Sequence, residues 1–334
     1  MIQQAVATVE PQWQKELKQS FTRPEELLRF LNIEPQGLEA DFAARDLFAM
    51  RVPRPFANLM TKGDLNDPLL KQVLPLKEEF KQVPGYVADP LAEHKSALPG
   101  LLHKYKSRVL VVFRGGCAVN CRYCFRRHFP YQDNNVNKAQ LLEHIQYLRD
   151  HAEVNEVILS GGDPLMAKDE HVAWFINELE AIPHILRLRI HSRLPVVIPS
   201  RLTSNLIDTL ASSRLKAVLV LHINHANEIS DELAKACRSV REKGIWLLNQ
   251  AVLLSGINHE LEDQINLSEA LFAADIQPYY LHLLDKVAGA SHFDLPETDA
   301  LGLYQAMMAA LPGFLLPRLV REIGGEASKT PVLP

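Results

Sequence analysis

From residue 108 onward, short apolar runs alternate with longer amphipathic segments, and this alternation limits the possible folds more than any other feature. The apolar runs predict strands at 108–113, 156–162, 186–192, 217–223, 245–254 and 277–285. The segments between them predict helices, among them 138–152, 171–182, 231–244 and 267–276. Strands that each precede a helix indicate a parallel sheet with right-handed crossovers. The predicted fold class is α/β, and periodicity alone leaves an open sheet, a partial barrel and a full barrel as alternatives.

Polar side chains gather at the carboxyl ends of these predicted strands. They are residues 160–163, 191–193, 222–225, 249–250 and Asp285. The carboxyl ends of parallel strands meet at one edge of the sheet, where barrels of this kind carry their chemistry. We therefore expect the functional site at that edge.

Residues 1–95 do not follow this alternation. Residues 23–33 have helical periodicity, with Pro24 near the start, whereas 51–60 and 63–70 are interrupted by Pro, Gly or Asn. We interpret 1–95 as an N-terminal helical region that wraps around a main domain of residues 96–334. A simple helical cap is the alternative interpretation.

Composition excludes several classes of protein. The 334 residues are 47% hydrophobic and carry a formal net charge of −4, so no basic excess indicates a nucleic acid or an anionic membrane as partner. No apolar run approaches the roughly 20 residues of a membrane span, and the N-terminus lacks the apolar core of a signal peptide. Four cysteines do not form a disulfide framework. We expect a cytoplasmic protein; the oligomeric state is not indicated.

Three of the cysteines, Cys117, Cys121 and Cys124, follow the first predicted strand with the spacing C-x3-C-x2-C. A zinc site would need a fourth ligand, which His128 could supply. Alternatively, three thiolates could hold a [4Fe–4S] cluster and leave one iron open to another ligand. Cys237 lies in a predicted helix, where it is best interpreted as a small buried apolar residue.

Three other segments are candidates for cofactor binding. Gly161 and Gly162 follow the second predicted strand, where glycine lets the backbone approach a ligand closely or simply forms a tight turn. Lys329 stands in a glycine-rich segment near the C-terminus, and a lysine amine can form a Schiff base with pyridoxal phosphate, although such a lysine is more often merely solvated. Lys104 and Arg108 precede the first strand and are candidate phosphate ligands.

The segments "CAVNCRYC" and "SGGDP" resemble those of radical S-adenosylmethionine (SAM) enzymes. In that family the open iron is chelated by the amino and carboxylate groups of SAM. The resemblance implies a partial (β/α)6 barrel with an N-terminal helical extension, and a [4Fe–4S] cluster held by the three cysteines. It also implies contacts to SAM from residues near the strand ends, namely Ser160, Gly161, Gly162, Asp163, His222 and Gln250.

From about residue 45 to the end, the chain resembles the lysine 2,3-aminomutases. The motifs are "PGLLHKY", "CAVNCRYCFRRHF", "SGGDPL", "SRLPVVIPSR", "HINHANEI", "NQAVLL", "PYYLHLLD" and "GGEASKTP". The resemblance implies an isomerase in which Lys329 holds pyridoxal phosphate and Lys104 and Arg108 bind its phosphate. Arg126 would pair with the substrate carboxylate, and Asp285 and Glu322 with the substrate ammonium. A buried carboxylate pair of that kind needs a cation, which favours lysine as substrate.

The chain departs from the family pattern at several points. Lys104 replaces the usual arginine, and Glu322 replaces an aspartate that is one methylene shorter. The sequence ends five residues after Lys329, without the family's cysteine-rich tail. With the segments "FRRHFPY" and "REIGGEASKTP", this resembles the short form that makes (R)-β-lysine, which a separate ligase attaches to elongation factor P.

Other functions stay open on the sequence. They are an aminomutase for catabolism or osmolyte synthesis, a radical methyltransferase or RNA-modifying enzyme, and a zinc-binding module.

Overall fold

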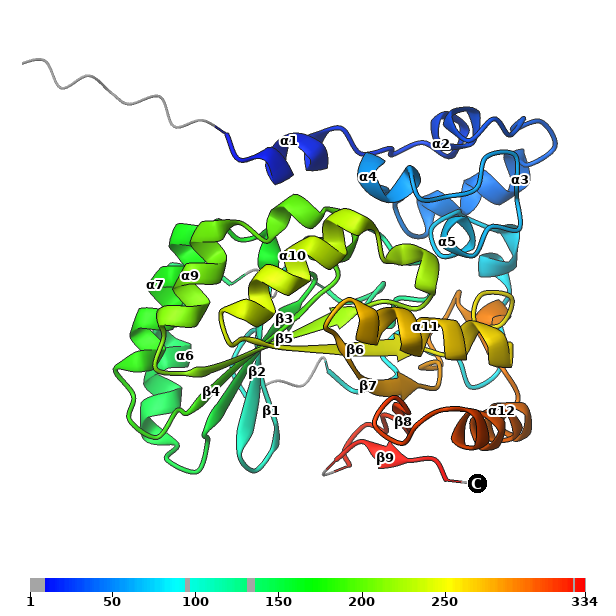
Figure 1. The fold of residues 1–334 in the computed structure, drawn as a ribbon. Helices are drawn as coiled ribbons and strands as arrows, with labels where there is room; N and C mark the ends of the chain where they lie inside the picture. Colours follow the sequence, from blue (N-terminus) through cyan, green and yellow to red (C-terminus); the bar gives the residue numbers. More distant parts are fainter. Residues whose placement is uncertain (1–9, 94–96, 131–135, 327, 334) are drawn as a thin grey trace, which may run out of the picture.

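The computed structural model describes residues 10–93, 97–130, 136–326 and 328–333. Its centre is a nine-stranded sheet in which the strands are neighbours in sequence order (Figure 1). The strands are β1 (Leu101–Tyr105), β2 (Arg108–Arg114), β3 (Glu156–Gly161), β4 (Arg187–Ser192), β5 (Lys216–His222), β6 (Trp246–Val252), β7 (Gln277–His282), β8 (Arg318–Arg321) and β9 (Thr330–Pro331). Strands β2 to β8 are parallel, and β1 and β9 add antiparallel partners at the two ends.

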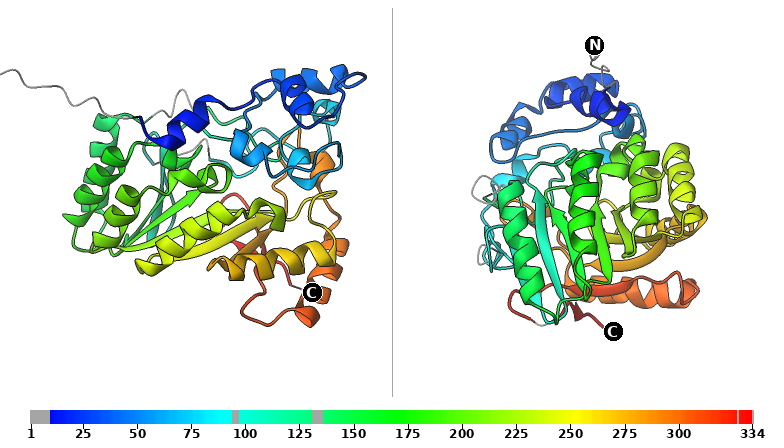
Figure 2. Two further views of the ribbon diagram at one scale, coloured as in Figure 1. Left: turned by 45° about the horizontal axis from the view of Figure 1, so that its top comes forward. Right: turned by 90° about the vertical axis from the view of Figure 1, so that its left-hand side faces the viewer.

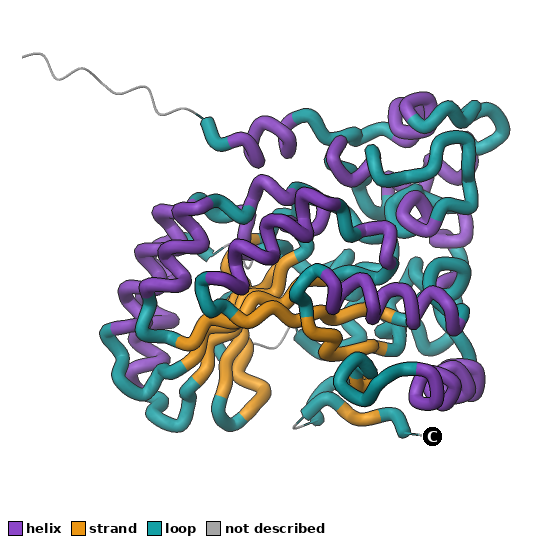
Figure 3. Tube along the Cα trace, in the orientation of Figure 1, coloured by secondary structure: helices purple, strands orange, loops and turns teal. Residues whose placement is uncertain are grey.

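The parallel strands alternate with helices that pack against one face of the curved sheet (Figures 2 and 3). These helices are α6 (Lys138–Asp150), α7 (Asp169–Glu180), α8 (Leu194–Val197), α9 (Ser204–Ser212), α10 (Asp231–Glu242), α11 (Leu261–Ala273) and α12 (Glu297–Ala310). No ladder joins β9 back to β1 among the described strands. The prediction of an α/β partial barrel is therefore confirmed.

The six strands predicted from the sequence are β2 to β7. Strands β1, β8 and β9 were not predicted, because each is short or mixes charged with apolar residues. The hairpin of β1 and β2 has a consequence for the site, because it places Lys104 and Arg108 close together.

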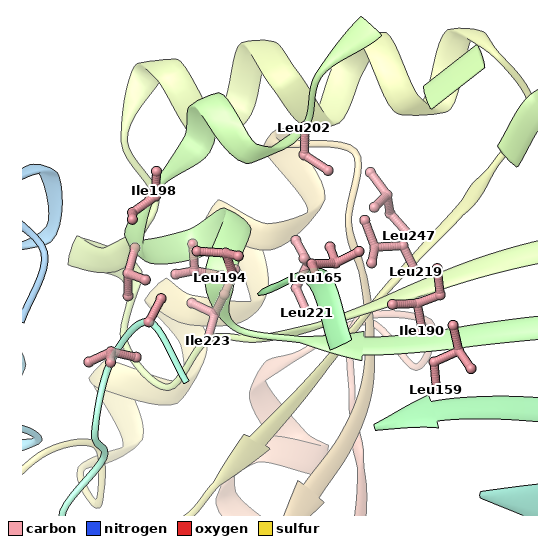
Figure 4. Close-up of a cluster of buried hydrophobic side chains, with 14 of the residues drawn as sticks. Leu159, Leu165, Ile190, Leu194, Ile198, Leu202, Leu219, Leu221, Ile223 and Leu247 are labelled. Atoms are coloured by element: carbon pink, nitrogen blue, oxygen red, sulfur yellow. The ribbon is translucent and has the colours of Figure 1, made fainter. Parts of the chain in front are cut away.

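The core between the sheet and its helices is built from one register of the strands. Val111, Leu159, Ile190, Leu219 and Leu247 pair in a row across β2 to β6, and all are buried. Figure 4 shows four of them with leucine and isoleucine side chains from the loops and short helices above. Each fully buried side chain of this size contributes about 1.5–3 kcal/mol of hydrophobic stabilisation. Neighbouring residues in each strand face the other side, inside the barrel.

The N-terminal region lies across the loops at the carboxyl ends of the strands (Figure 1). Its helices are α1 (Gln12–Lys18), α2 (Pro24–Phe30), α3 (Glu39–Phe42), α4 (Arg54–Ala57) and α5 (Pro68–Lys71). Pro24 occupies the first turn of α2, as expected for a residue with fixed φ and no N–H. The domain boundary predicted at residue 95 lies outside the described residues. No helix in the described part of the chain is long and apolar enough to cross a membrane.

Glu79 connects this N-terminal region to the cysteine loop. Its carboxylate accepts hydrogen bonds from Arg122 Nη2 and Arg127 Nη2, each at 2.6 Å, and all three side chains are buried. Arg122 also donates to the carbonyl oxygens of Phe48 and Ala44. The loop is thus held by contacts to the N-terminal region as well as by the sheet.

Candidate active site

A cavity of about 550 Å³ occupies the interior of the barrel. Every site residue predicted from the sequence lines it: Lys104, Arg108, Cys117, Cys121, Cys124, Arg126, Ser160, Gly161, Gly162, Asp163, His222, Gln250, Asp285, Glu322 and Lys329. The predicted location, the carboxyl edge of the sheet, covers only part of this cavity. The cavity begins at the carboxyl ends of the strands and also reaches Arg108, Glu156 and Arg187 at the amino ends of β2, β3 and β4.

The three cysteines lie in the loop that follows β2. Arg51 donates a hydrogen bond to the carbonyl oxygen of Cys117 at 3.0 Å, and Cys124 donates its backbone N–H to the carbonyl of Cys121. Burial and the nearby cysteine raise the pKa of Cys124 to about 11, and burial also raises the pKa of Cys117. A free thiolate is therefore disfavoured at Cys117 and Cys124, and a positively charged metal centre would stabilise it.

The structure does not assemble the ligand set of the zinc interpretation among the described residues. Among the described residues, no group of three His, Cys, Asp or Glu side chains is placed to hold one metal ion. His128, the fourth ligand in the zinc interpretation, is exposed and its Nε2 contacts the carbonyl oxygen of Ala288 at 3.1 Å. A [4Fe–4S] cluster binds each thiolate to a different iron, so its cysteines need not converge on one point.

Gly161 and Gly162 allow the end of β3 to approach the cysteine loop. Gly161 has φ of +118°, and a Cβ atom there would lie 2.6 Å from the carbonyl oxygen of Arg114. A Cβ on Gly162 would lie 2.6 Å from the carbonyl oxygen of Gly116. The close approach that these glycines permit is therefore to the backbone of the loop that carries the cysteines, beside the cavity wall that they also form.

Asp163 holds the next loop in place. Its Oδ1 accepts hydrogen bonds from Leu165 N and Ser192 Oγ, and its Oδ2 accepts from the backbone N–H groups of Arg193 and Leu194, at 2.7–3.0 Å. With these four donors bound, the carboxylate organises the strand ends. Its predicted assistance to SAM stays a prediction.

Three partly buried histidines, His191, His222 and His282, line the cavity. Burial, followed by the charge of Arg193, lowers the pKa of His222 to about 3, and burial lowers the pKa values of His191 and His282 far below the usual range. All three are neutral at physiological pH. Nε2 of His191 and Nε2 of His282 are buried and have no hydrogen-bond partner among the described residues. Unpartnered buried polar atoms indicate that this cavity binds a polar ligand.

The basic residues Lys104 and Arg108 face the cavity from the β1–β2 hairpin. The Arg108 guanidinium stacks 3.9 Å from the centre of the Tyr105 ring, which restricts its position. Lys104 Nζ lies 3.2 Å from Glu93 Oε1 and 3.9 Å from Glu322 Oε1. Two cations on one hairpin form a suitable site for a phosphate.

Lys329, Glu322 and Asp285 lie beside this hairpin, because Glu322 contacts both Lys104 and Lys329. Lys329 Nζ donates to Glu322 Oε2 at 2.5 Å. Burial and the charge of Glu322 raise the pKa of Asp285 to about 7, although Lys329 opposes this shift. The carboxylate pair therefore has too little positive charge around it to keep both members ionised, which is a condition that a cationic substrate group would correct.

Sequence reasoning placed His191 and Arg193 at the functional edge without giving them a role, and it did not single out Glu93 or His282, which line the same cavity. His191 and His282 lie in β4 and β7, and alternation along those strands could have assigned them to the barrel interior. Arg193 follows β4, at the predicted edge. Glu93 lies in an irregular segment, and nothing in the local sequence marks it.

Comparison with known proteins agrees with this geometry. Residues 111–267, which span β3 to β6 and most of β2, match the family model of the Radical SAM superfamily. Radical SAM enzymes carry a [4Fe–4S] cluster and bind SAM. The structure of Streptococcus suis SuiB bound to S-adenosylmethionine shares 17% identity, with a TM-score of 0.49 over 65% of this chain and 50% of that one.

Curated relatives narrow the class. An L-lysine 2,3-aminomutase of Escherichia coli K12 is 52% identical over 96% of this chain and 94% of its own length, and one of Haemophilus influenzae is 49% identical over 98% and 97%. An L-lysine 2,3-aminomutase of Acetoanaerobium sticklandii is 34% identical over 96% of this chain and 78% of its own length. The chain therefore belongs to the lysine 2,3-aminomutase family of radical SAM isomerases.

Proposed function

We propose that the protein converts L-α-lysine to (R)-β-lysine by a radical 2,3-amino shift that uses a [4Fe–4S] cluster, SAM and pyridoxal phosphate. The observation that carries this proposal is the single cavity that joins the cysteine loop to Lys329, its acidic partners and the cationic hairpin. When bound, the cluster and SAM supply hydrogen-atom abstraction, and pyridoxal phosphate supplies a π-system through which an amino group can migrate.

In this proposal the carboxyl ends of the strands hold the radical machinery. Cys117, Cys121 and Cys124 bind the cluster. Residues 160–162, with His222 and Gln250, contact SAM. The neutral imidazole of His222 can donate or accept a hydrogen bond without placing a second cation beside the sulfonium, because its pKa is about 3.

The other half of the cavity holds the amino acid and pyridoxal phosphate. Lys329 would hold pyridoxal phosphate through its amine, and Lys104 and Arg108 would hold the phosphate group. Glu322, which pairs with Lys329 in this structure, would then be available to the substrate ammonium. Asp285 completes the ammonium site and is better ionised once that cation arrives. Arg126 faces the substrate carboxylate.

Enclosure by the barrel protects the reactive species. Buried apolar residues such as Ile158 and Leu284 line the cavity together with the neutral histidines. Fixed positions for both ends of lysine keep its β-carbon near the radical source, which is the main contribution that the protein makes.

We further propose that the product serves elongation factor P, through the ligase that attaches β-lysine to it. The support is the resemblance of residues 125–131 and 321–331 to the short form; Tyr131 and Ala327 in these segments lie outside the described residues. The higher identity to the E. coli and H. influenzae relatives than to the A. sticklandii relative is consistent with that subgroup.

The test is anaerobic reconstitution with iron, sulfide, pyridoxal phosphate, SAM, a reductant and α-lysine, followed by chromatography for β-lysine. We expect β-lysine from the wild type and none from Lys329→Ala. SAM cleavage without β-lysine would contradict the substrate assignment. Mass measurement of elongation factor P from a deletion strain tests the second proposal, and an unchanged mass would contradict it.

A further inference from the structure

The carboxylate of Glu93 lies between two cations on different parts of the cavity wall. Its Oε2 accepts from Arg126 Nε at 2.6 Å, and its Oε1 accepts from Arg126 Nη2 at 3.1 Å and from Lys104 Nζ at 3.2 Å. Only 5% of the Glu93 side chain is exposed. The residue comes from the segment before β1, so it joins the N-terminal part of the chain to the cysteine loop and the β1–β2 hairpin.

Glu93 is ionised despite its burial. Burial raises the pKa of Glu93, but Arg126 and Lys104 together outweigh burial and lower it to about 2. A carboxylate that binds two cations leaves one net positive charge in the trio, so the group still attracts an anionic ligand.

Arg126 is fixed in orientation by these contacts. Glu93 accepts hydrogen bonds from Nε and Nη2 on one edge of the guanidinium. Nη1 donates to Ser160 Oγ at 3.0 Å and to the carbonyl oxygen of Gly161 at 3.1 Å. An arginine side chain loses rotamer freedom when it binds a ligand, and these contacts impose that loss before any ligand arrives. The guanidinium is therefore held in a fixed orientation relative to the end of β3.

We propose that Glu93 is a positioning residue for the reaction, which sets Arg126 and Lys104 at a fixed separation and so fixes the spacing between the substrate carboxylate and the cofactor phosphate. This inference rests on the proposed function, in which Arg126 and Lys104 bind those two groups. It assigns a role to a residue that contacts neither reacting atom and acts through two neighbours.

The test compares Glu93→Gln and Glu93→Asp with the wild-type holoenzyme. Glu93→Gln removes the charge and keeps the size, so we expect the KM for lysine to rise about tenfold, as for loss of a charge-assisted hydrogen bond. The dissociation constant of pyridoxal phosphate, measured by absorbance titration without substrate, should also rise. Inhibition by 1,5-diaminopentane, which lacks the carboxylate, should change much less than the KM for lysine.

Glu93→Asp keeps the charge but shortens the side chain, so it should restore part of the lysine affinity. If Glu93→Gln does not fold, Glu93→Asp still allows the change in the KM for lysine to be compared with the change in inhibition by 1,5-diaminopentane. The matched control is Glu34→Gln, which removes an exposed carboxylate from the N-terminal region and should behave as wild type.

A wild-type KM and an unchanged cofactor titration in Glu93→Gln would overturn the inference. A lower KM would also overturn it, because Glu93 would then compete with the substrate for Arg126. Failure of the proposed function looks different: the wild type itself would form no β-lysine, and the cofactor titration of the variants would still test the link between Glu93 and Lys104.

Discussion

Arg193 donates a hydrogen bond from Nη1 to Sγ of Cys121 across 2.7 Å. The same side chain is buried and binds Glu228 Oε2 at 2.9 Å and Gln72 Oε1 at 2.7 Å, so its position is determined from several sides. Hydrogen bonds to the sulfur ligands of an iron–sulfur cluster raise its reduction potential, because they stabilise the more negative reduced state.

Arg193→Gln should therefore lower the midpoint potential of the cluster. Electron paramagnetic resonance at controlled potentials measures this directly, and reductive cleavage of SAM should depend on a stronger reductant. The variant also leaves Glu228 buried without its cation, which should reduce stability by about 3–5 kcal/mol. Arg193→Lys keeps the charge and separates the two effects; an unchanged potential in both variants would show that the contact has no electronic role.

Lysine binding should depend on pH through Asp285. In the proposed function Asp285 binds the substrate ammonium, which only its carboxylate form attracts, and the pKa of Asp285 in the ligand-free protein is about 7. As pH falls below 7, the protonated fraction grows and the KM for lysine should rise by up to about tenfold per pH unit. Asp285→Asn should bind lysine weakly at every pH and lose this dependence, so a pH profile that survives in Asp285→Asn would assign it to another group.

The same pKa shift has a consequence for stability. Because the pKa of Asp285 is raised from 3.8 to about 7, the folded state binds the proton more tightly than the unfolded state. The associated stability is present at low pH and is lost as pH rises through 7. Asp285→Asn should therefore melt at a higher temperature than the wild type at pH 8, with a smaller difference at pH 5.

Gly162→Ala should damage the cysteine loop. Its new Cβ would lie 2.6 Å from the carbonyl oxygen of Gly116 and 2.8 Å from backbone atoms of Gly115, so the loop must shift, at a cost of about 1–3 kcal/mol. We expect a lower melting temperature and less iron per chain after reconstitution. Gly302→Ala is the matched control, because no atom lies within 4 Å of its Cβ position in α12 and alanine favours a helix by about 1 kcal/mol. Equal iron content in the two variants would contradict the packing argument.

Lys329→Ala should abolish tight binding of pyridoxal phosphate while the cluster remains. The cofactor's absorbance should stay that of the free aldehyde, and SAM cleavage should persist because the cysteine loop lies elsewhere in the cavity. Glu326→Gln, an exposed change in the same segment, serves as the control. Loss of iron in Lys329→Ala would instead indicate that the substitution unfolds the site.

The strands that could be predicted are those that lie in the same environment, between the helices and the cavity. Strands β2 to β7 are covered by helices on one face and by the cavity or its lining on the other, and their apolar runs stand out from the amphipathic helices. Strand β1 contains His103 and Lys104 because it lies at the end of the sheet, and β8 is only four residues long. Neither has a pattern that distinguishes it from a loop.

The site was predictable where a short motif marks the chemistry. Cysteine spacing, the glycine pair and Lys329 lie in such motifs, and the cavity brings them together. Glu93 was missed because its importance depends on two partners, Arg126 and Lys104, that lie 33 and 11 residues further along the chain. The contact of Arg193 with Cys121 spans 72 residues and arises only from tertiary packing.

Because of Glu79, the N-terminal region and the cysteine loop cannot be exchanged independently between related proteins. A chimera that took its first 95 residues from a distant relative without a matching acid would remove the buried carboxylate that pairs with both Arg122 and Arg127. Any exchange of parts between such proteins has to transfer the acid and the two arginines together.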